Sequence, residues 1–328
     1  WRSAGERALY RSAYIEAVAH LREAERMIAL LPEGESRWNI DLGVQLLLGP
    51  ALLMTRGHAA RETEEAHLHA NELCHRLGNT HAQFPILYGL WSVYAVRPQY
   101  AKSLEFGEQL LAIAKSIGQT DLIVLAHNAL GYSKFNMGDL RSARHHYQEG
   151  NQVHDKTLHR HLAAQVGTDP YAQILFQDAW ILAMLGFPDQ AAKKFDVVWE
   201  WVTELNHPFT TCFTLIMVCN YHQFLHQPDK ALATAQQLIT ISDEQGFPVW
   251  KIVGELFAGW GRAMQGESDA PPKMDHVLRS PLIHSSTRVY LLSRVVEAYL
   301  RFDRLAEADT VLQEAEQLCE KWEERFWK

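Results

Sequence analysis

The sequence has few of the residues that break or bend a chain. Its 328 residues include 12 prolines and 19 glycines, and these fall between long amphipathic stretches. Val, Ile and Thr never dominate an alternating run, which argues against strands almost everywhere. We therefore expect the chain to be helical nearly throughout.

Cysteine and positive charge are also scarce. Four cysteines in a chain of this length do not form a disulfide framework, so we expect a reducing, cytoplasmic location. The net charge of −8 argues against binding to nucleic acid, because phosphate groups attract a basic surface. No apolar run approaches the roughly 20 residues that a membrane helix needs, so we expect no membrane contact.

The chain begins at Trp1, without an initiator Met or a signal peptide. We interpret it as a fragment of a larger multidomain protein.

The clearest helical hairpin spans residues 122–155. Its second half places Ala143 and Tyr147 on one helical face. Between the halves, Gly138 suits a left-handed helix end and Asp139 suits the cap of the next helix. This pattern predicts two antiparallel helices that pack together across a tight turn.

The hairpin recurs about every 40 residues. A small residue returns near the start of each second helix, at Ala17, Ser103, Ala143, Ala191, Ala231 and Ala308. We expect turns near Gly138, Gly186, Pro228 and Asp303, and we expect Ala143 and Ala191 to face the first helix of their own hairpin. A period of this length indicates a solenoid, in which each hairpin buries its apolar face against its neighbours.

The prediction is an all-α fold with more than about 60% helix. We expect one domain over residues 1–328, a right-handed α-solenoid of about eight hairpins. The seventh hairpin, around residues 266–283, should be irregular, because Pro271, Pro272 and Pro281 leave room only for a short second helix.

The residues of the clearest hairpin resemble the tetratricopeptide repeat (TPR). In that family a Leu-Gly pair lies on the first helix, as Leu130-Gly131 does here, and a small residue followed by an aromatic lies on the second, as Ala143 and Tyr147 do. The units here are longer than the usual repeat of about 34 residues. The resemblance therefore implies TPR-like hairpins with longer helices.

Four short sequence segments resemble a more particular group, the C-terminal repeats of large bacterial signalling proteins. They are Leu47–Leu52, Glu72–Gly78, Gly167–Pro170 and Glu244–Pro248. In those proteins an AAA or STAND ATPase, often behind an adenylate/guanylate cyclase domain, precedes the repeats. The resemblance implies that any ATPase or cyclase activity resides outside this chain.

Sequence patterns of catalysis are missing from the chain. There is no Gly-rich phosphate loop, no nucleophile elbow and no metalloprotease helix. We expect neither enzymatic activity nor a cofactor.

One weak metal candidate exists, formed by Cys219, His222 and His226. On a helix these residues fall within an arc of about 60°, and their side chains suit zinc. The alternative, which we favour, is that Cys219 packs against the partner helix, because it occupies the position that Gly131 and Ala179 fill in other hairpins.

Histidines gather in the middle of the chain. His145, His146, His154, His159 and His161 lie among Arg141, Arg144, Lys156 and Arg160. Acid pH would charge this segment, so it could form a switch or an anion-binding patch. The favoured alternative is the exposed side of a helix and the loop that follows it.

The concave wall of a stacked-hairpin solenoid is formed by its first helices. Residues that point into this groove are expected to be Tyr88, Leu125, Asn128, Tyr132, Phe176, Trp180, Met184, Asn220, Gln223, Phe224, Leu256, Trp260 and Met264. Large amphipathic side chains with a few amides suit capture of a peptide or a small effector. Equally, a tightly wound superhelix could bury the same residues against itself.

Our leading hypothesis is a non-enzymatic TPR scaffold or sensor module for signal transduction. It would bind a protein or peptide segment, or a small effector, in the groove and regulate an attached ATPase or nucleotide cyclase. The alternative is a sugar-sensing domain resembling that of maltose-regulator-like transcription activators. An effector held among Trp180, Phe224 and Trp260 would favour that alternative.

Overall fold

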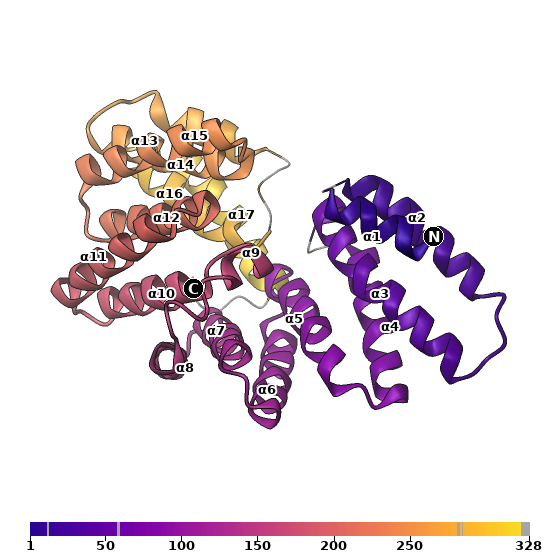
Figure 1. Ribbon diagram of the computed structural model, residues 1–328. Helices are drawn as coiled ribbons and strands as arrows, with labels where there is room; N and C mark the ends of the chain where they lie inside the picture. The colour runs from indigo at the N-terminus through magenta and orange to yellow at the C-terminus, as the bar shows by residue number, and fades with distance from the viewer. Residues whose placement is uncertain (12, 58–59, 281–282, 284, 323–328) are drawn as a thin grey trace. The chain divides into compact units, whose positions relative to one another are not determined.

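The protein is an array of helical hairpins (Figure 1). The structure, a computed structural model, describes residues 1–11, 13–57, 60–280, 283 and 285–322. It is 82% helical, and no strand occurs in the described residues, which confirms the predicted all-α fold.

Two compact units divide the chain. Unit 1 comprises Trp1–Ser133 and unit 2 comprises Lys134–Lys328, so the boundary falls inside one helix. The single continuous domain over residues 1–328 stays a prediction, as does the packing of Leu122–Met137 on Leu140–Asp155 across this boundary.

Unit 1 consists of three hairpins and most of the helix that begins the fourth. Its helices are α1 (Arg2–Tyr10), α2 (Tyr14–Ile28), α3 (Glu35–Arg56), α4 (Arg61–Leu77), α5 (Thr80–Val96), α6 (Tyr100–Ile117) and α7 (Thr120–Asn136). The members of each pair α1/α2, α3/α4 and α5/α6 pack together. In addition, α2 packs on α3 and α4 packs on α5, so each second helix also contacts the hairpin that follows it. Each hairpin thus buries apolar surface against its neighbours, as a solenoid requires.

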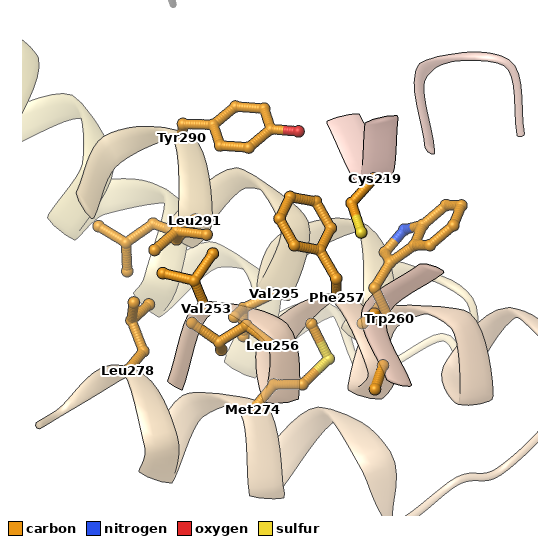
Figure 2. Packing of buried hydrophobic residues seen from close by; sticks show 14 of the residues in the cluster. Cys219, Val253, Leu256, Phe257, Trp260, Met274, Leu278, Tyr290, Leu291 and Val295 are labelled. Atoms are coloured by element: carbon orange, nitrogen blue, oxygen red, sulfur yellow. The ribbon is translucent and has the colours of Figure 1, made fainter. Parts of the chain in front are cut away.

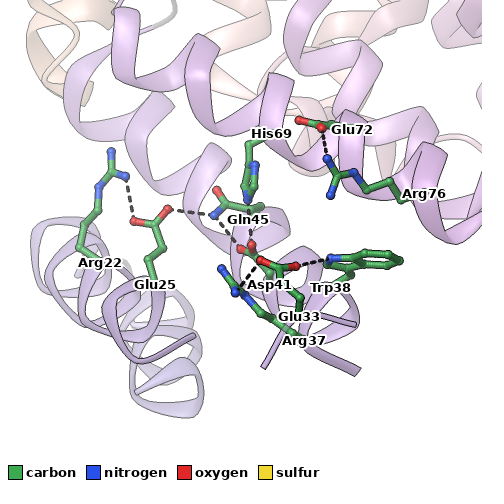
Figure 3. A network of polar contacts seen from close by, with 10 residues as sticks. All are labelled: Arg22, Glu25, Glu33, Arg37, Trp38, Asp41, Gln45, His69, Glu72 and Arg76. Atoms are coloured by element: carbon green, nitrogen blue, oxygen red, sulfur yellow. Dashed lines mark hydrogen bonds and ion pairs between the residues drawn. The ribbon is translucent and has the colours of Figure 1, made fainter. Parts of the chain in front are cut away.

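Polar contacts join α2, α3 and α4 in unit 1 (Figure 3). Gln45 of α3 donates a hydrogen bond to Glu25 of α2 at 2.8 Å, and His69 of α4 lies 2.8 Å from Asp41 of α3. Burial acts to raise the pKa of Asp41, but hydrogen bonds from His69 and Gln45 outweigh it and hold the pKa below its usual value. The hydrogen bond to Asp41 raises the pKa of His69. The pair therefore favours its ionised form.

Unit 2 contains the remaining helices. They are α8 (Leu140–Val153), α9 (Leu162–Val166), α10 (Pro170–Met184), α11 (Pro188–Leu205), α12 (Pro208–Phe224), α13 (Pro228–Gln245), α14 (Pro248–Met264), α15 (Ala270–Leu278), α16 (Ser285–Leu300) and α17 (Leu305–Trp322). The five helices α10 to α14 all begin with a proline, which loses no helical hydrogen bond at that position. The pairs α10/α11, α12/α13, α14/α15 and α16/α17 form hairpins.

The predicted turns are confirmed. Gly138, Gly186 and Asp303 all have positive φ, and α13 begins at Pro228. The Asp139 side chain caps α8 by accepting from a backbone N–H at 3.1 Å, as its position next to Gly138 predicts. The spacing from Ala143 to Ala191 exceeds one period because a connection, residues 154–169, separates α8 from α10 and contains the short helix α9.

The seventh hairpin is irregular, as expected. Its second helix, α15, has only nine residues, whereas α13 has 18. Pro271 and Pro272 lie in the first turn of α15. The short helix still packs on α14, because Met274 fills the space beside Gly259.

Candidate functional site

The first helices of unit 2 pack on one another in series. Helix α12 contacts α10 and α14, and α14 also contacts α16. Cys219 of α12 shares a buried cluster with Phe257 and Trp260 of α14 (Figure 2). The space between these first helices is therefore filled by side chains.

This packing corrects the expected groove. The Trp260 side chain has no exposed surface and Trp180 is only 4% exposed, so the expectation that they line an open groove is wrong. The alternative, that the solenoid buries these rings in its own core, is confirmed for both. The rings of Phe224 and Trp180 form a T-shaped pair with centroids 5.4 Å apart, yet Phe224 remains 44% exposed.

The other expected groove residues differ in exposure. Leu125, Asn128, Phe176, Asn220, Gln223 and Leu256 are buried, whereas Tyr88, Tyr132, Met184 and Met264 are partly buried. Whether any of them contacts a partner stays a prediction.

In unit 1, two of the expected residues, Tyr88 and Tyr132, lie next to Trp91 of α5. Its ring lies 5.1 Å from that of Tyr88 and 5.9 Å from that of Tyr132. The indole N–H donates to the carbonyl of Ala129 and the hydroxyl of Ser133, both at 3.1 Å. The interactions of Trp91 thus fix the relative positions of α5 and α7 within this unit.

A row of aromatic rings in unit 2 was not anticipated. We call Phe209, Phe213, Phe247 and Trp250 the aromatic row. Trp250 stacks on Phe213 with ring centroids 5.7 Å apart. Phe209 forms T-shaped pairs with Trp250 and Phe247, with centroids 5.2 and 5.4 Å apart. All four rings are partly exposed, so they offer apolar surface where Trp180 and Trp260 do not.

The sequence does contain a signal for the aromatic row. Phe209 follows the proline that begins α12, and Trp250 lies in the first turn after the proline that begins α14. Repetition of an aromatic ring at the start of successive first helices would have identified the feature.

Several buried polar atoms lack a partner among the described residues. Two are side-chain amide oxygens on neighbouring first helices, Oε1 of Gln177 on α10 and Oδ1 of Asn220 on α12. A third is the indole Nε1 of Trp260 on α14. A buried polar group without a hydrogen bond costs about 1–3 kcal/mol, so each is a position where a bound group could improve stability.

The structure does not bring the three residues of the metal candidate together as ligands. The thiol of Cys219 is buried beside the carbonyl of Ala231, and burial raises its pKa. His222 contacts Gln227, whereas His226 faces Glu297 at 3.5 Å. In the part of the chain that is described, no group of three His, Cys, Asp or Glu side chains could hold a metal ion.

The histidine segment is not a uniformly exposed face. His159 is 1% exposed, and the ring of His154 stacks on Tyr171 with centroids 3.8 Å apart. The ring of His154 also faces the edge of Trp201, and its Nε2 is buried without a partner in the described residues. Burial and the neighbouring His159 lower the pKa of His154 to about 4. The favoured expectation of an exposed loop is therefore wrong for His159, whereas His154 is partly exposed.

Two buried carboxyl groups help to join the helices around this connection. Asp169 accepts hydrogen bonds from the indole N–H of Trp201 at 2.8 Å and from a backbone N–H of α10. Burial raises its pKa despite these bonds. Asp178 of α10 pairs with Arg144 of α8 and Lys194 of α11. These contacts are structural and link α8, α10 and α11.

Comparison with known proteins bears on the fold. No protein-family model matches the chain, and no curated protein matches it. Solved structures do match. One is a Rap protein complexed with Competence and Sporulation Factor, at a TM-score of 0.72 and 12% identity, covering 99% of this chain and 98% of that one.

Two further structures are similar. Aspartyl phosphate phosphatase F from Bacillus subtilis matches at a TM-score of 0.64 and 11% identity, over 87% of this chain and 71% of that one. The Rap conjugation gene regulator of plasmid pLS20, in complex with the Phr* peptide, matches at a TM-score of 0.55 and 14% identity. The match covers 93% of this chain and 74% of that one.

At such low identity, the likeness shows the fold. The TPR-like helical-repeat solenoid that the sequence predicts is confirmed. Among the described helices, none has both the length and the apolar character needed to cross a lipid bilayer.

Proposed function

We propose that this chain is a non-enzymatic scaffold that binds an extended peptide segment on the first helices of unit 2. One observation carries the proposal: partly exposed aromatic rings and buried amide oxygens, which have no partner in the described part of the chain, occur on the same set of helices. Phe213 and Asn220 are seven residues apart on α12, which places them on one face about two turns apart.

The exposed rings and the buried amide oxygens suit different parts of a peptide. The aromatic row would cover apolar side chains, and aromatic anchors commonly contribute 2 kcal/mol or more. The oxygens of Gln177 and Asn220 are buried in the free protein and would accept hydrogen bonds from peptide N–H groups that insert between the first helices. Two of the similar solved structures contain the Phr* peptide and Competence and Sporulation Factor, which supports a binding role for this type of fold.

The finer part of the proposal concerns regulation. We infer from the sequence resemblance that binding biases an attached signalling ATPase or nucleotide cyclase in the cytoplasm. A phosphate-binding loop or cyclase domain elsewhere in the parent protein would support this inference. A parent protein composed only of repeats would overturn it.

A small effector is the less favoured ligand. Its expected aromatic platform was Trp180, Phe224 and Trp260, and two of these three rings are buried. We therefore do not extend the proposal to the sugar-sensing alternative.

Selection from a library of random twelve-residue peptides tests the proposal. A fluorescein-labelled peptide enriched on the immobilised chain would be titrated by fluorescence anisotropy. Asn220→Ala should weaken binding about 5–30-fold and Phe213→Ala by about 30-fold or more, because they remove an acceptor and an anchor. Gln236→Ala, an exposed amide on α13, is the matched control and should bind like the wild type.

Two results would overturn this proposal. One is the absence of any enriched peptide. The other is an enriched peptide whose affinity changes with neither Asn220→Ala nor Phe213→Ala, with both variants folded by circular dichroism.

A further inference from the structure

Gln223 connects two first helices that are not consecutive in the array. The hydroxyl of Tyr290 on α16 donates to Oε1 of Gln223 on α12 at 2.8 Å. Nε2 of Gln223 then donates to Oε2 of Glu297, also on α16, at 3.0 Å. We call these three residues the α12–α16 clasp.

The clasp completes a ring of contacts. Helix α14 already packs against both α12 and α16, so the link from α12 to α16 joins all three first helices. The buried side chains of Cys219, Phe257 and Trp260 lie in the cluster at this junction, with the ring of Tyr290 6.4 Å from that of Phe257 (Figure 2). Cys219 and Trp260 have no exposed surface, so a partner could contact them only when this packing opens.

The clasp is held by polar contacts, which can break and re-form. Its links are polar, and Glu297 is partly exposed beside the guanidinium of Arg294 and the imidazole of His226. Water can therefore compete for the carboxylate. In the closed state, Trp260 Nε1 and Asn220 Oδ1 have no partner among the described residues, and a ligand bound in the open state could satisfy these atoms.

We infer that the α12–α16 clasp is an autoinhibitory closure that controls access to the buried polar atoms of α12 and α14, Asn220 Oδ1 and Trp260 Nε1, while the aromatic row stays partly exposed. The inference rests on the proposed function for what is kept out, namely the peptide. Opening of the clasp, however, is a property of the free protein and can be measured without a partner.

The thiol of Cys219 reports clasp opening. It is fully buried on α12, four residues before Gln223, so it can react only when the surrounding packing opens. The rates at which N-ethylmaleimide labels the four native thiols would be resolved by mass spectrometry. Tyr290→Phe should raise the rate at Cys219 at least tenfold while Cys74 and Cys319 keep their rates.

A matched control lies on the same helix. Tyr299 is a buried tyrosine of α16 outside the clasp, so Tyr299→Phe should leave the Cys219 rate unchanged. Glu297→Ala is the second clasp variant. It removes a partly exposed side chain and should also raise the Cys219 rate selectively.

A selective increase at Cys219 in either clasp variant supports the inference. The inference is overturned if neither variant raises that rate, or if every increase extends equally to Cys74 and Cys319. Because no peptide is present, this result is independent of whether the peptide-binding proposal succeeds.

Discussion

The imidazole of His67 fills the space that a side chain on Gly89 would need. A Cβ atom at Gly89 of α5 would lie 2.1 Å from Nε2 of His67, and one at Gly49 of α3 would lie 2.8 Å from Cε1. His67 itself belongs to α4, and its Nδ1 is 2.7 Å from the carbonyl of Thr63. Burial lowers the pKa of His67, which favours a neutral ring that donates to this carbonyl. The two glycines therefore allow α3 and α5 to pack against one histidine.

Gly89→Ala should destabilise the protein by about 1–3 kcal/mol, because the added methyl overpacks this contact. Urea unfolding measures the change. In Gly89→Ala combined with His67→Ala, the loss should be smaller than the sum of the two single losses, since the clash is gone. Strictly additive losses of stability would show that residue 89 and the side chain of His67 do not contact each other.

Trp180→Ala should cost about 3–5 kcal/mol of unfolding free energy, because Trp180 is a core residue. Phe224→Ala, at the exposed ring that touches Trp180, should cost clearly less. Equal costs for the two substitutions would show that burial does not distinguish these rings.

Ala191→Leu should destabilise the protein by about 1–3 kcal/mol, because Ala191 has no exposed surface and a larger side chain would overpack α11. Ala143→Leu on α8 should act in the same way. Ala233→Leu, at an exposed position of α13, should change stability by less than about 0.5 kcal/mol. An unchanged denaturation midpoint for Ala191→Leu would mean that the predicted packing face is wrong.

His154 should make the protein less stable in acid. Its folded pKa is about 4, whereas an unfolded histidine titrates near 6.5, so the unfolded chain binds more protons between these values. As the pH falls from about 6.5 to 4, His154 should therefore lower the free energy of unfolding by about 1–2 kcal/mol, after allowance for its partial exposure. Well above pH 6.5, His154 is neutral in both states and should not lower the free energy of unfolding.

Comparison of the wild type with His154→Phe isolates this effect. Phenylalanine can keep the stack on Tyr171 but cannot bind a proton. The stability of the wild type relative to the variant should fall as the pH drops through this window. A difference that stays constant from pH 7 to pH 4 would show that His154 is not the titrating group.

The architecture could be predicted because its determinants are local. Gly138 and Asp139 specify a turn and a cap within a few residues, and the repeated small residues identify the packing faces. The nine-residue α15 also follows directly from Pro271 and Pro272.

The site could not be predicted to the same extent, because exposure depends on how successive hairpins stack. Asn220 and Trp260 both lie on first helices, but the sequence does not say that the neighbouring helices would bury them. Contacts over long separations were also invisible. The bond between Gln223 and Glu297 joins residues 74 positions apart, and no local pattern marks it.

Hydroxyl-radical footprinting tests the central claim, that a peptide lies on the aromatic row, most directly. The oxidation of Phe213 and Trp250 would be measured by mass spectrometry with and without a saturating concentration of the enriched peptide. Trp199 of α11 is 41% exposed and serves as an internal control. We predict that the peptide slows oxidation of Phe213 and Trp250 several-fold and leaves Trp199 unchanged. Protection of Trp199 with no change at Phe213 and Trp250 would contradict the account.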